Sequence, residues 1–433
     1  MRSDARPIET TVVDLTHDGR GVADVDGRRV FVPDALPGER IQIVLGKRRR
    51  KLQEAELVGL LEPSASRVQP ACEYFGTCGG CALQHLDHGA QVRFKQDVVA
   101  QALTRIARME PGEWLPPVTG PSWHYRRRAR LGVKFVAAKE RVLVGFRERS
   151  GRYITDMRSC PVLMPPVDAL LGELADVIGQ TSIRARLPQI EAAVGERSAA
   201  LVLRVLEEPT AADTALFAEF GRRHDLDIYL QPGGPGTITP LGAARTLDYS
   251  LPAFGLTLTF LPTDFVQVNA AVNAELVATA LRLAAPGPQD RVLDLYCGLG
   301  NFSLPFAQRA RELLGVEGDA GLVARAVRNA ASNGIGNARF VAADLTASYS
   351  GFFREPWDIV VLDPPRTGAE APIAEMDKAS PRRIVYVSCH PATLARDARV
   401  LVEQRGYRLA VAGVFDMFPH THHVEALAVF ERE

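Results

Sequence analysis

The sequence predicts a mixed α/β chain whose C-terminal part is a mostly parallel sheet with helices on both faces. Strand-like and helix-like runs alternate from about residue 263 onwards, five short strand-like runs fill residues 1–62, and the stretch between them mixes both types. We therefore expect an N-terminal OB-like β-barrel at 1–62, a central α+β domain at 63–262 and a C-terminal α/β domain at 263–433.

The amino-acid composition indicates the class of protein and its cellular compartment. The chain has 433 residues, 46% hydrophobic and 24% charged, as expected for a globular protein of two or three domains. No run approaches the roughly 18 apolar residues of a membrane span, and the first residues lack the apolar core of a signal peptide. We expect a cytoplasmic monomer with no membrane partner, in which the cysteines stay reduced.

The N-terminal runs are punctuated by turn residues and fit a small barrel of a kind that often binds oligonucleotides. The formal net charge of the chain is zero, yet Lys47–Lys51 reads KRRRK. Tyr125–Arg152 holds ten Lys or Arg against two Glu, a net of +8. Local basic patches of this kind bind phosphates, although a solvated surface face is the alternative for each block.

The central stretch predicts a helix near Gln91–Arg108, strands in RARLGVKFV, RVLVGF, AALVLRVL and LDIYLQ, and helices around 166–179 and 211–224. The segment around 91–124 is expected to pack with the C-terminal domain. Apart from its basic charge and Cys160, this stretch carries no motif of its own.

VLDLYCGLGNFSLPFA (292–307) reads as a strand, a glycine turn and a helix. Gly298 and Gly300 allow a tight turn and a close approach to a ligand, but the third glycine of a dinucleotide-binding fingerprint is missing. Asp294 in the strand, Glu317 closing the next strand and Asp344 after the third resemble the class I, Rossmann-like, S-adenosylmethionine methyltransferases. In that pattern Glu317 would bind the ribose hydroxyls and Asp344 the adenine.

DPPR (363–366) closes the fourth strand, where such enzymes meet the base that they methylate. Amino-group methyltransferases often carry an aromatic residue after the two prolines to stack on adenine. Arg366 stands there instead, which disfavours adenine or guanine N-methylation.

Cys389 follows the strand-like run IVYVS and precedes a helix-like run, so it lies at a ligand-binding strand end. As a small buried hydrophobe it would be a core filler. As a nucleophile it suits methylation at carbon 5 of uracil, because thiolate addition at carbon 6 makes carbon 5 reactive and a base must later remove the carbon-5 proton. Glu425, among three histidines before the final strand, is the candidate base, with a pKa that apolar neighbours would raise.

Three thiols lie in one short loop, at Cys72, Cys78 and Cys81, and Cys160 is the expected fourth. The spacing lacks the two CxxC pairs of common zinc sites. Four thiolates suit either a [4Fe-4S] cluster or zinc. Cys297 is left over beside the glycine turn, as packing.

SCHPATLARD, MFPHTHHVE, LDPPR, LDLYCGLGNF and FVQVN together resemble the RNA uracil-5-methyltransferase family. The loop CEYFGTCGGC is similar to the iron–sulfur ligands of its 23S ribosomal RNA branch, and DGRGVADVDGRRVFVPDALPGE to a TRAM domain, a small RNA-binding barrel. The resemblance spans nearly the whole chain. His390 stands where the family usually has Asn, and His422 where a smaller residue is common.

The resemblance implies a class of substrate and a role for each of these residues. The substrate would be a uracil of 23S ribosomal RNA, methylated through a covalent link between Cys389 and carbon 6, with Glu425 as base. It implies S-adenosylmethionine among Gln267, Tyr296, Asn301, Glu317, Asp344 and Asp363, and a [4Fe-4S] cluster on Cys72, Cys78, Cys81 and Cys160.

Several alternatives stay open at this point. A dual-site 23S enzyme shares the architecture, and a transfer-RNA enzyme shares the chemistry but lacks the barrel and the cysteine loop. A cytosine-5 enzyme usually places its nucleophile in the Pro-Pro motif, where this chain has Arg366. A non-catalytic iron–sulfur protein that binds RNA or senses redox state would leave Cys389 without a task.

Overall fold

The computed structural model describes residues 6–46, 53–149, 151–345, 351–376 and 381–432. The basic block Lys47–Lys51 lies outside them. The chain forms two compact units: unit 1 comprises Met1–Lys95, Phe146–Thr155 and Phe418–His423, and unit 2 comprises Gln96–Gly145, Asp156–Met417 and Val424–Glu433. Within the described ranges, no helix is both long enough and apolar enough to cross a membrane. The expected division at 62 and 262 stays a prediction.

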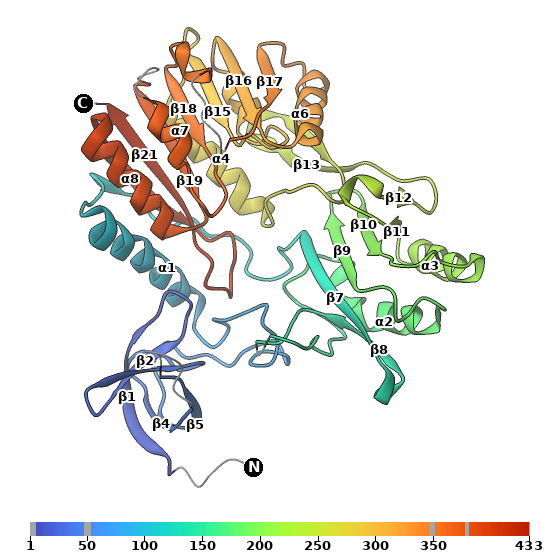
Figure 1. The fold of residues 1–433 in the computed structure, drawn as a ribbon. Helices are drawn as coiled ribbons and strands as arrows, with labels where there is room; N and C mark the ends of the chain where they lie inside the picture. The colour runs from blue at the N-terminus through green and yellow to red at the C-terminus, as the bar shows by residue number, and fades with distance from the viewer. Residues whose placement is uncertain (1–5, 47–52, 150, 346–350, 377–380, 433) are drawn as a thin grey trace. The chain divides into compact units, whose positions relative to one another are not determined.

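Unit 1 contains the five-stranded antiparallel sheet that the sequence predicted, in the order β3-β2-β1-β4-β5. Figure 1 labels four of its strands, β1, β2, β4 and β5. Its strands are β1 (Ile8–Leu15), β2 (Gly21–Val25), β3 (Arg28–Val32), β4 (Arg40–Leu45) and β5 (Ala55–Glu62). A parallel bridge between Phe31 and Glu54 joins the two edges, so the sheet curls into a barrel. Val12, Val30, Ile41 and Ile43 fill its interior, because alternate residues of a strand point to the same face.

Unit 2 carries a six-stranded sheet in the order β12-β11-β10-β9-β7-β8, and a separate hairpin. The sheet strands are β7 (Arg128–Val136), β8 (Arg141–Gly145), β9 (Gln189–Val194), β10 (Ala199–Arg204), β11 (Leu226–Gln231) and β12 (Thr239–Pro240). Helices α2 (Leu171–Gln180) and α3 (Ala211–Arg223) pack on it, against β8 and β11 respectively. Strands β13 (Leu247–Leu251) and β14 (Leu256–Phe260) form the hairpin.

The main sheet of unit 2 has eight strands in the order β17-β16-β15-β18-β19-β21-β20-β6. They are β15 (Arg291–Leu295), β16 (Glu312–Glu317), β17 (Ala338–Ala342), β18 (Ile359–Leu362), β19 (Arg383–Ser388), β20 (Tyr407–Phe415), β21 (Glu425–Arg432) and β6 (Glu113–Trp114). The first five in the order are parallel to one another, and β21 is antiparallel to both neighbours. This is the parallel α/β sheet that the alternating pattern predicted.

Both faces of this sheet are covered. Leu293, Val360 and Ile384 on one face join a large apolar core, while Val361 and Val385 on the other face are also fully buried, the pattern of a sheet between two layers of helices. The helices are α4 (Ala270–Ala284), α5 (Ser303–Ala307), α6 (Ala320–Ser332), α7 (Glu370–Glu375) and α8 (Pro391–Arg405). Figure 1 labels α4, α6, α7 and α8 beside the strands of this sheet. Short 3₁₀ turns occupy Ala137–Lys139, Val167–Ala169, Pro235–Thr237, Pro252–Phe254 and Phe352–Arg354.

A segment from the first half of the chain packs on one face of the main sheet and adds a strand to its edge. Helix α1 (His88–Ala102) continues into a π-helical turn at Leu103–Ala107, and Val99, Leu103 and Ala107 belong to the core of the main sheet. Strand β6 then pairs in parallel with β20, with Glu113 opposite Val411. The outermost long strand is therefore not left as an open edge.

Candidate active site

The carboxyl ends of the parallel strands bring several of the predicted side chains to one edge of the main sheet. Tyr296 follows β15, Glu317 closes β16, Asp363 follows β18 and Cys389 follows β19. Because neighbouring parallel strands end at the same edge, these residues gather although nearly a hundred positions separate the first from the last. Open α/β sheets bind their ligands at this edge.

Cys389 and Glu425 meet across the β19/β21 ladder. Ser388 pairs with Ala426 in the antiparallel register, so the next step places Cys389 opposite Glu425. The thiol is half-buried, whereas the carboxyl side chain is only 3% exposed. A sulfur that a ligand can reach and a carboxyl group shielded from water therefore share one strand end.

The electrostatics of this edge favour protonated groups. Burial, with the charges of Glu425 and Asp363, raises the pKa of the Cys389 thiol to about 11, while the Arg366 guanidinium acts in the opposite direction. Burial raises the pKa of Asp363 to about 7, helped by the charge of Glu317. Burial and then Asp363 also raise the pKa of Glu425 well above its ordinary value. Such a carboxyl group can hold or accept a proton at neutral pH.

The glycine turn after β15 uses three left-handed residues. Tyr296 has φ +65°, Gly298 +56° and Gly300 +101°, a conformation that suits glycine. The Glu317 carboxylate accepts hydrogen bonds from the backbone N–H groups of Gly298 and Asp319, each at 3.1 Å. A Cβ placed on Gly298 would meet no atom within 4 Å. The Glu317 carboxylate at the end of β16 therefore holds the glycine turn, and the space beside Gly298 is open.

Asn301 fixes the far end of this turn. Its side-chain oxygen accepts from the Tyr249 hydroxyl at 3.0 Å and from the Asn273 amide at 2.9 Å, and its own amide donates to Asn273 at 2.9 Å. Neither partner was predicted from the sequence. Tyr249 lies in the hairpin and carries no motif, and the one hint for Asn273 is its place one helical turn after Asn269, which caps α4.

Asp294 lies beneath the turn, 1% exposed, and accepts a hydrogen bond from the Ser303 hydroxyl. Its second oxygen has no partner among the described residues. Burial raises its pKa to about 7, against the effect of Ser303. The acid in this strand therefore ties β15 to α5 from inside the sheet.

The remaining residues that were predicted to bind the cofactor lie in the loops at the same edge of the sheet. Gln267 is half-buried in the segment between β14 and α4, and Asp344 is exposed after β17. The Tyr296 hydroxyl donates to the backbone oxygen of Leu345 at 3.3 Å, which links the loops after β15 and β17. The structure thus brings Tyr296 and the Asp344 loop together at the β15/β17 side.

His390 has a structural task at the start of α8. It is the N-cap, and its Nδ1 accepts from the backbone N–H of Thr393 at 3.3 Å. Asn caps helices by the same kind of bond. The departure from the family pattern therefore keeps the cap that positions the helix directly after Cys389.

The cysteines divide between the two units. Cys72, Cys78 and Cys81 lie in unit 1 and Cys160 in unit 2, and none forms a disulfide. Cys78 and Cys160 are buried, and the other two are half-buried. Within the part of the chain that the structure describes, no three His, Cys, Asp or Glu side chains stand as a preformed metal site.

Four of the ten basic side chains in the stretch Tyr125–Arg152 form ion pairs with carboxylates of the protein. Arg128 and Arg130 both pair with Glu191, Arg141 pairs with Asp156, and Arg149 pairs with Asp34 at 2.6 Å. The net charge of Tyr125–Arg152 therefore overstates the cationic surface. The cations of this stretch that remain exposed outside these pairs include Lys134, Lys139, Arg147 and Arg152.

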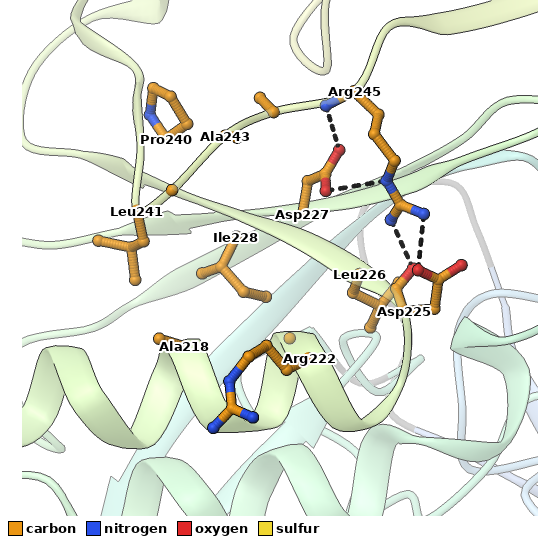
Figure 2. A pocket seen from close by; sticks show the side chains of 13 residues that line it. Ala218, Arg222, Asp225, Leu226, Asp227, Ile228, Pro240, Leu241, Ala243 and Arg245 are labelled. Atoms are coloured by element: carbon orange, nitrogen blue, oxygen red, sulfur yellow. Dashed lines mark hydrogen bonds and ion pairs between the residues drawn. The ribbon is translucent and has the colours of Figure 1, made fainter.

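A hollow of about 370 Å³ lies elsewhere in unit 2, between α3, β11 and residues 240–245. Figure 2 shows Ile228 and Leu241 on its wall, while Arg245 is engaged by Asp225 and Asp227. None of the predicted catalytic or cofactor residues lines it. The candidate active site is therefore the strand edge with Cys389, not this hollow.

A solved structure shares the fold over almost the whole chain. The tRNA (uracil-54, C5)-methyltransferase of Pyrococcus abyssi, solved with S-adenosyl-L-homocysteine, is 24% identical, with a TM-score of 0.74 over 98% of this chain and 100% of that one. The strand order, with the glycine turn and its acid, is that of the class I methyltransferase fold.

Comparisons with related sequences show to which family of methyltransferases the chain belongs. Residues 255–433 match the family model described as tRNA (Uracil-5-)-methyltransferase. The 23S rRNA (uracil(1939)-C(5))-methyltransferases RlmD of Methylococcus capsulatus and Alkalilimnicola ehrlichii are 49% and 50% identical, each over 99% of this chain and 98% and 97% of their own lengths. The chain belongs to the RNA uracil-C5-methyltransferase family, in the branch of the RlmD enzymes.

Proposed function

We propose that the protein methylates carbon 5 of uracil 1939 in 23S ribosomal RNA, the reaction in the name of its relatives. The observation that carries this proposal is the pairing of a reachable thiol, Cys389, with a buried carboxyl group, Glu425, at the strand end beside the glycine turn. A carbon-5 methylation needs these two groups, one to activate the ring and one to remove its proton.

In the proposed mechanism the Cys389 sulfur, as thiolate, bonds to carbon 6 of the uracil and pushes electron density onto carbon 5 and the O4 oxygen. When bound, S-adenosylmethionine supplies the methyl group that carbon 5 takes up. Glu425, as carboxylate, then removes the proton from carbon 5, and the bond between sulfur and carbon 6 breaks as the ring regains its double bond. The raised pKa of Glu425 suits a base that must take a proton from carbon.

We assign the cofactor to the edge formed by Gln267, Tyr296, Asn301, Glu317, Asp344 and Asp363. The open space beside Gly298 and the carboxylate of Glu317 fit a ligand with ribose hydroxyls. The Asn301 side chain already hydrogen-bonds with Asn273 and Tyr249. We therefore propose that Asn301 contributes to the cofactor site by holding the glycine turn in place.

We propose a [4Fe-4S] cluster on Cys72, Cys78, Cys81 and Cys160. Cys72, Cys78 and Cys81 lie in one loop outside any disulfide, and their thiols are soft donors. A Cβ on Gly80 would lie 3.5 Å from the Cys78 sulfur and 3.4 Å from Phe146, so glycine leaves room beside that thiol. When bound, the cluster would cross-link the loop and stabilise it.

We propose that the N-terminal barrel acts as a TRAM-like RNA anchor and that the protein works as a cytoplasmic monomer. Support for the anchor comes from the curled five-stranded sheet, which is the architecture of many oligonucleotide binders. Exposed cations such as Arg147 and Arg152 in unit 1 would meet phosphates.

The test of the function is to map 5-methyluridine in ribosomal RNA from a strain that lacks the gene and from one complemented with Cys389→Ala. We expect the modification to be lost at position 1939 in both and restored by the unaltered gene. Restoration by Cys389→Ala would refute the nucleophile, and modification at a transfer-RNA position instead would refute the substrate.

A further inference from the structure

Arg127 is a buried arginine next to the segment that leads into α4. It is 3% exposed. Its backbone is fixed on both sides, because its N–H donates to the carbonyl oxygen of Val268 at 3.1 Å and its own carbonyl oxygen accepts from the N–H of Val194 at 2.9 Å. Val268 directly follows Gln267, one of the residues that we assign to the cofactor. The position of Arg127 beside that residue is therefore set by the backbone.

The side chain of Arg127 is connected to the glycine turn through one aromatic ring. Its guanidinium carbon lies 5.4 Å from the centre of the Tyr249 ring, a cation–π contact. The Tyr249 hydroxyl donates to the Asn301 side chain at 3.0 Å, and Asn301 belongs to the glycine turn. The guanidinium thus lies one side chain away from the turn beside which we assign the cofactor.

The protein supplies no bound carboxylate for this buried cation. The Arg127 Nε is buried without a hydrogen-bond partner, and within the described residues its guanidinium forms no ion pair. Burial lowers the pKa of Arg127, and the charges of Glu196 and Asp248 oppose this effect. Both carboxylates have closer partners. Asp248 pairs with Arg197, and Glu196 accepts from the backbone N–H and the hydroxyl of Ser250, each at 2.7 Å.

A buried cation without a bound counter-ion is costly, so an anion that reaches it would be held strongly. RNA phosphates are bulky and meet exposed cations, whereas Arg127 is almost fully covered. A small ligand that enters beside the glycine turn meets the burial of this side chain better. S-adenosylmethionine is such a ligand, and the carboxylate of its methionine part is its one anionic group.

We propose that Arg127 binds the carboxylate of the methionine part of S-adenosylmethionine, with Tyr249 holding the guanidinium beside the glycine turn. The inference rests on the proposed function, because it takes the cofactor to lie at this edge of the sheet. A guanidinium suits the task, since its planar fork can donate two parallel hydrogen bonds to one carboxylate.

The test compares two ligands by calorimetry on the full-length protein without RNA. One is S-adenosylmethionine, and the other is decarboxylated S-adenosylmethionine, which lacks only that carboxylate. Arg127→Gln removes the charge, and Arg127→Lys keeps the charge without the planar fork. Arg197→Gln is the matched control, because it removes a nearby arginine whose carboxylate partner, Asp248, belongs to the protein. A thermal melt of each variant checks the fold.

We expect the unaltered protein to bind S-adenosylmethionine about 10–100-fold more tightly than the decarboxylated form, the range for a hydrogen bond to a charged group. Arg127→Gln should lose this preference, because it weakens the binding of S-adenosylmethionine alone. Arg127→Lys should keep part of the preference, and Arg197→Gln should keep all of it.

Equal affinity of the unaltered protein for the two ligands would overturn the proposal. An equal loss for both ligands in Arg127→Gln would also overturn it, and would show that Arg127 balances the buried Asp248 instead. Weaker RNA binding by Arg127→Gln with an unchanged preference would overturn it in favour of an RNA phosphate. Should Arg127→Gln fail to fold, a full preference in Arg127→Lys decides against the proposal. The cofactor assignment of the proposed function fails separately, if Glu317→Gln leaves the affinity for both ligands unchanged.

Discussion

Replacing Glu425 by glutamine should separate the two halves of the reaction. Glutamine keeps the size and shape of the buried side chain but cannot accept a proton. Attack by Cys389 on carbon 6 precedes proton removal from carbon 5, so the variant should still form the covalent link to RNA and then stall. Losing a general base costs about 10²–10⁴-fold in rate, or about 3–5 kcal/mol of barrier.

The same substitution should stabilise the free protein as the pH rises. Burial raises the pKa of Glu425 well above its ordinary value. In the unfolded chain this carboxyl group ionises first, near the ordinary glutamate pKa of about 4.3, so the folded protein loses stability from there up to the folded pKa. Glutamine does not titrate. The stability difference in favour of the variant should therefore grow by up to about 1.4 kcal/mol per pH unit across that window.

The assay is a labelled RNA fragment incubated with the variant and S-adenosylmethionine, then run on a denaturing gel. We expect a protein–RNA band that the double variant Cys389→Ala, Glu425→Gln does not give. Urea unfolding at pH 5 and pH 7 supplies the stability difference. Near-normal turnover with no retained band would refute the assignment of the base. A difference in unfolding free energy that does not change with pH would refute the argument from burial.

Three further predictions concern the proposed cluster, the buried Asp294 and the N-terminal barrel. Protein purified without air should be brown, with about four irons per chain, and Cys78→Ser should lose the colour; stoichiometric zinc without visible absorption would contradict this. Burial raises the pKa of Asp294 to about 7, so stability should fall as the pH rises from about 4 to 7, and Asp294→Asn should flatten that slope in urea unfolding; an unchanged slope would count against a buried acid. Deleting residues 1–62 should flatten the salt dependence of RNA binding and leave S-adenosylmethionine affinity unchanged in calorimetry, because the assigned cofactor residues follow residue 263; an unaltered salt slope would argue against the anchor.

The strongly patterned elements were predictable from the sequence, and the elements with weak local patterns were not. β10 and β11 were predicted because branched apolar residues fill them, whereas the neighbouring β9, QIEAAV, has a composition that favours no strand. The helix expected from 166 begins at Leu171, after a 3₁₀ turn that follows Pro166. Strand β6 has only two residues, too few to show the alternation of apolar and polar residues that predicts a strand.

The same distinction applies to the site. Cys389, Glu317 and Glu425 follow from motifs, because strand ends and short spacings are visible along the chain. Tyr249 and Asn273 act through hydrogen bonds to Asn301, which is distant in sequence from both, and no local pattern indicates such partners. The net charge of Tyr125–Arg152 overstated its exposed positive charge for the same reason. Glu191, which pairs with Arg128 and Arg130, lies more than sixty positions away in the sequence.

Strand β6 has a consequence for any attempt to isolate the catalytic part of the chain. A fragment that begins at residue 263 would lack Glu113 and Trp114, and β20 would then offer its unpaired N–H and C=O groups to solvent. The same cut removes Leu103 and Ala107 and leaves a void in the apolar layer that they fill. Such a fragment would tend to self-associate through the bare strand. The smallest soluble catalytic piece should therefore start before α1, so its boundary in sequence lies far upstream of its first motif.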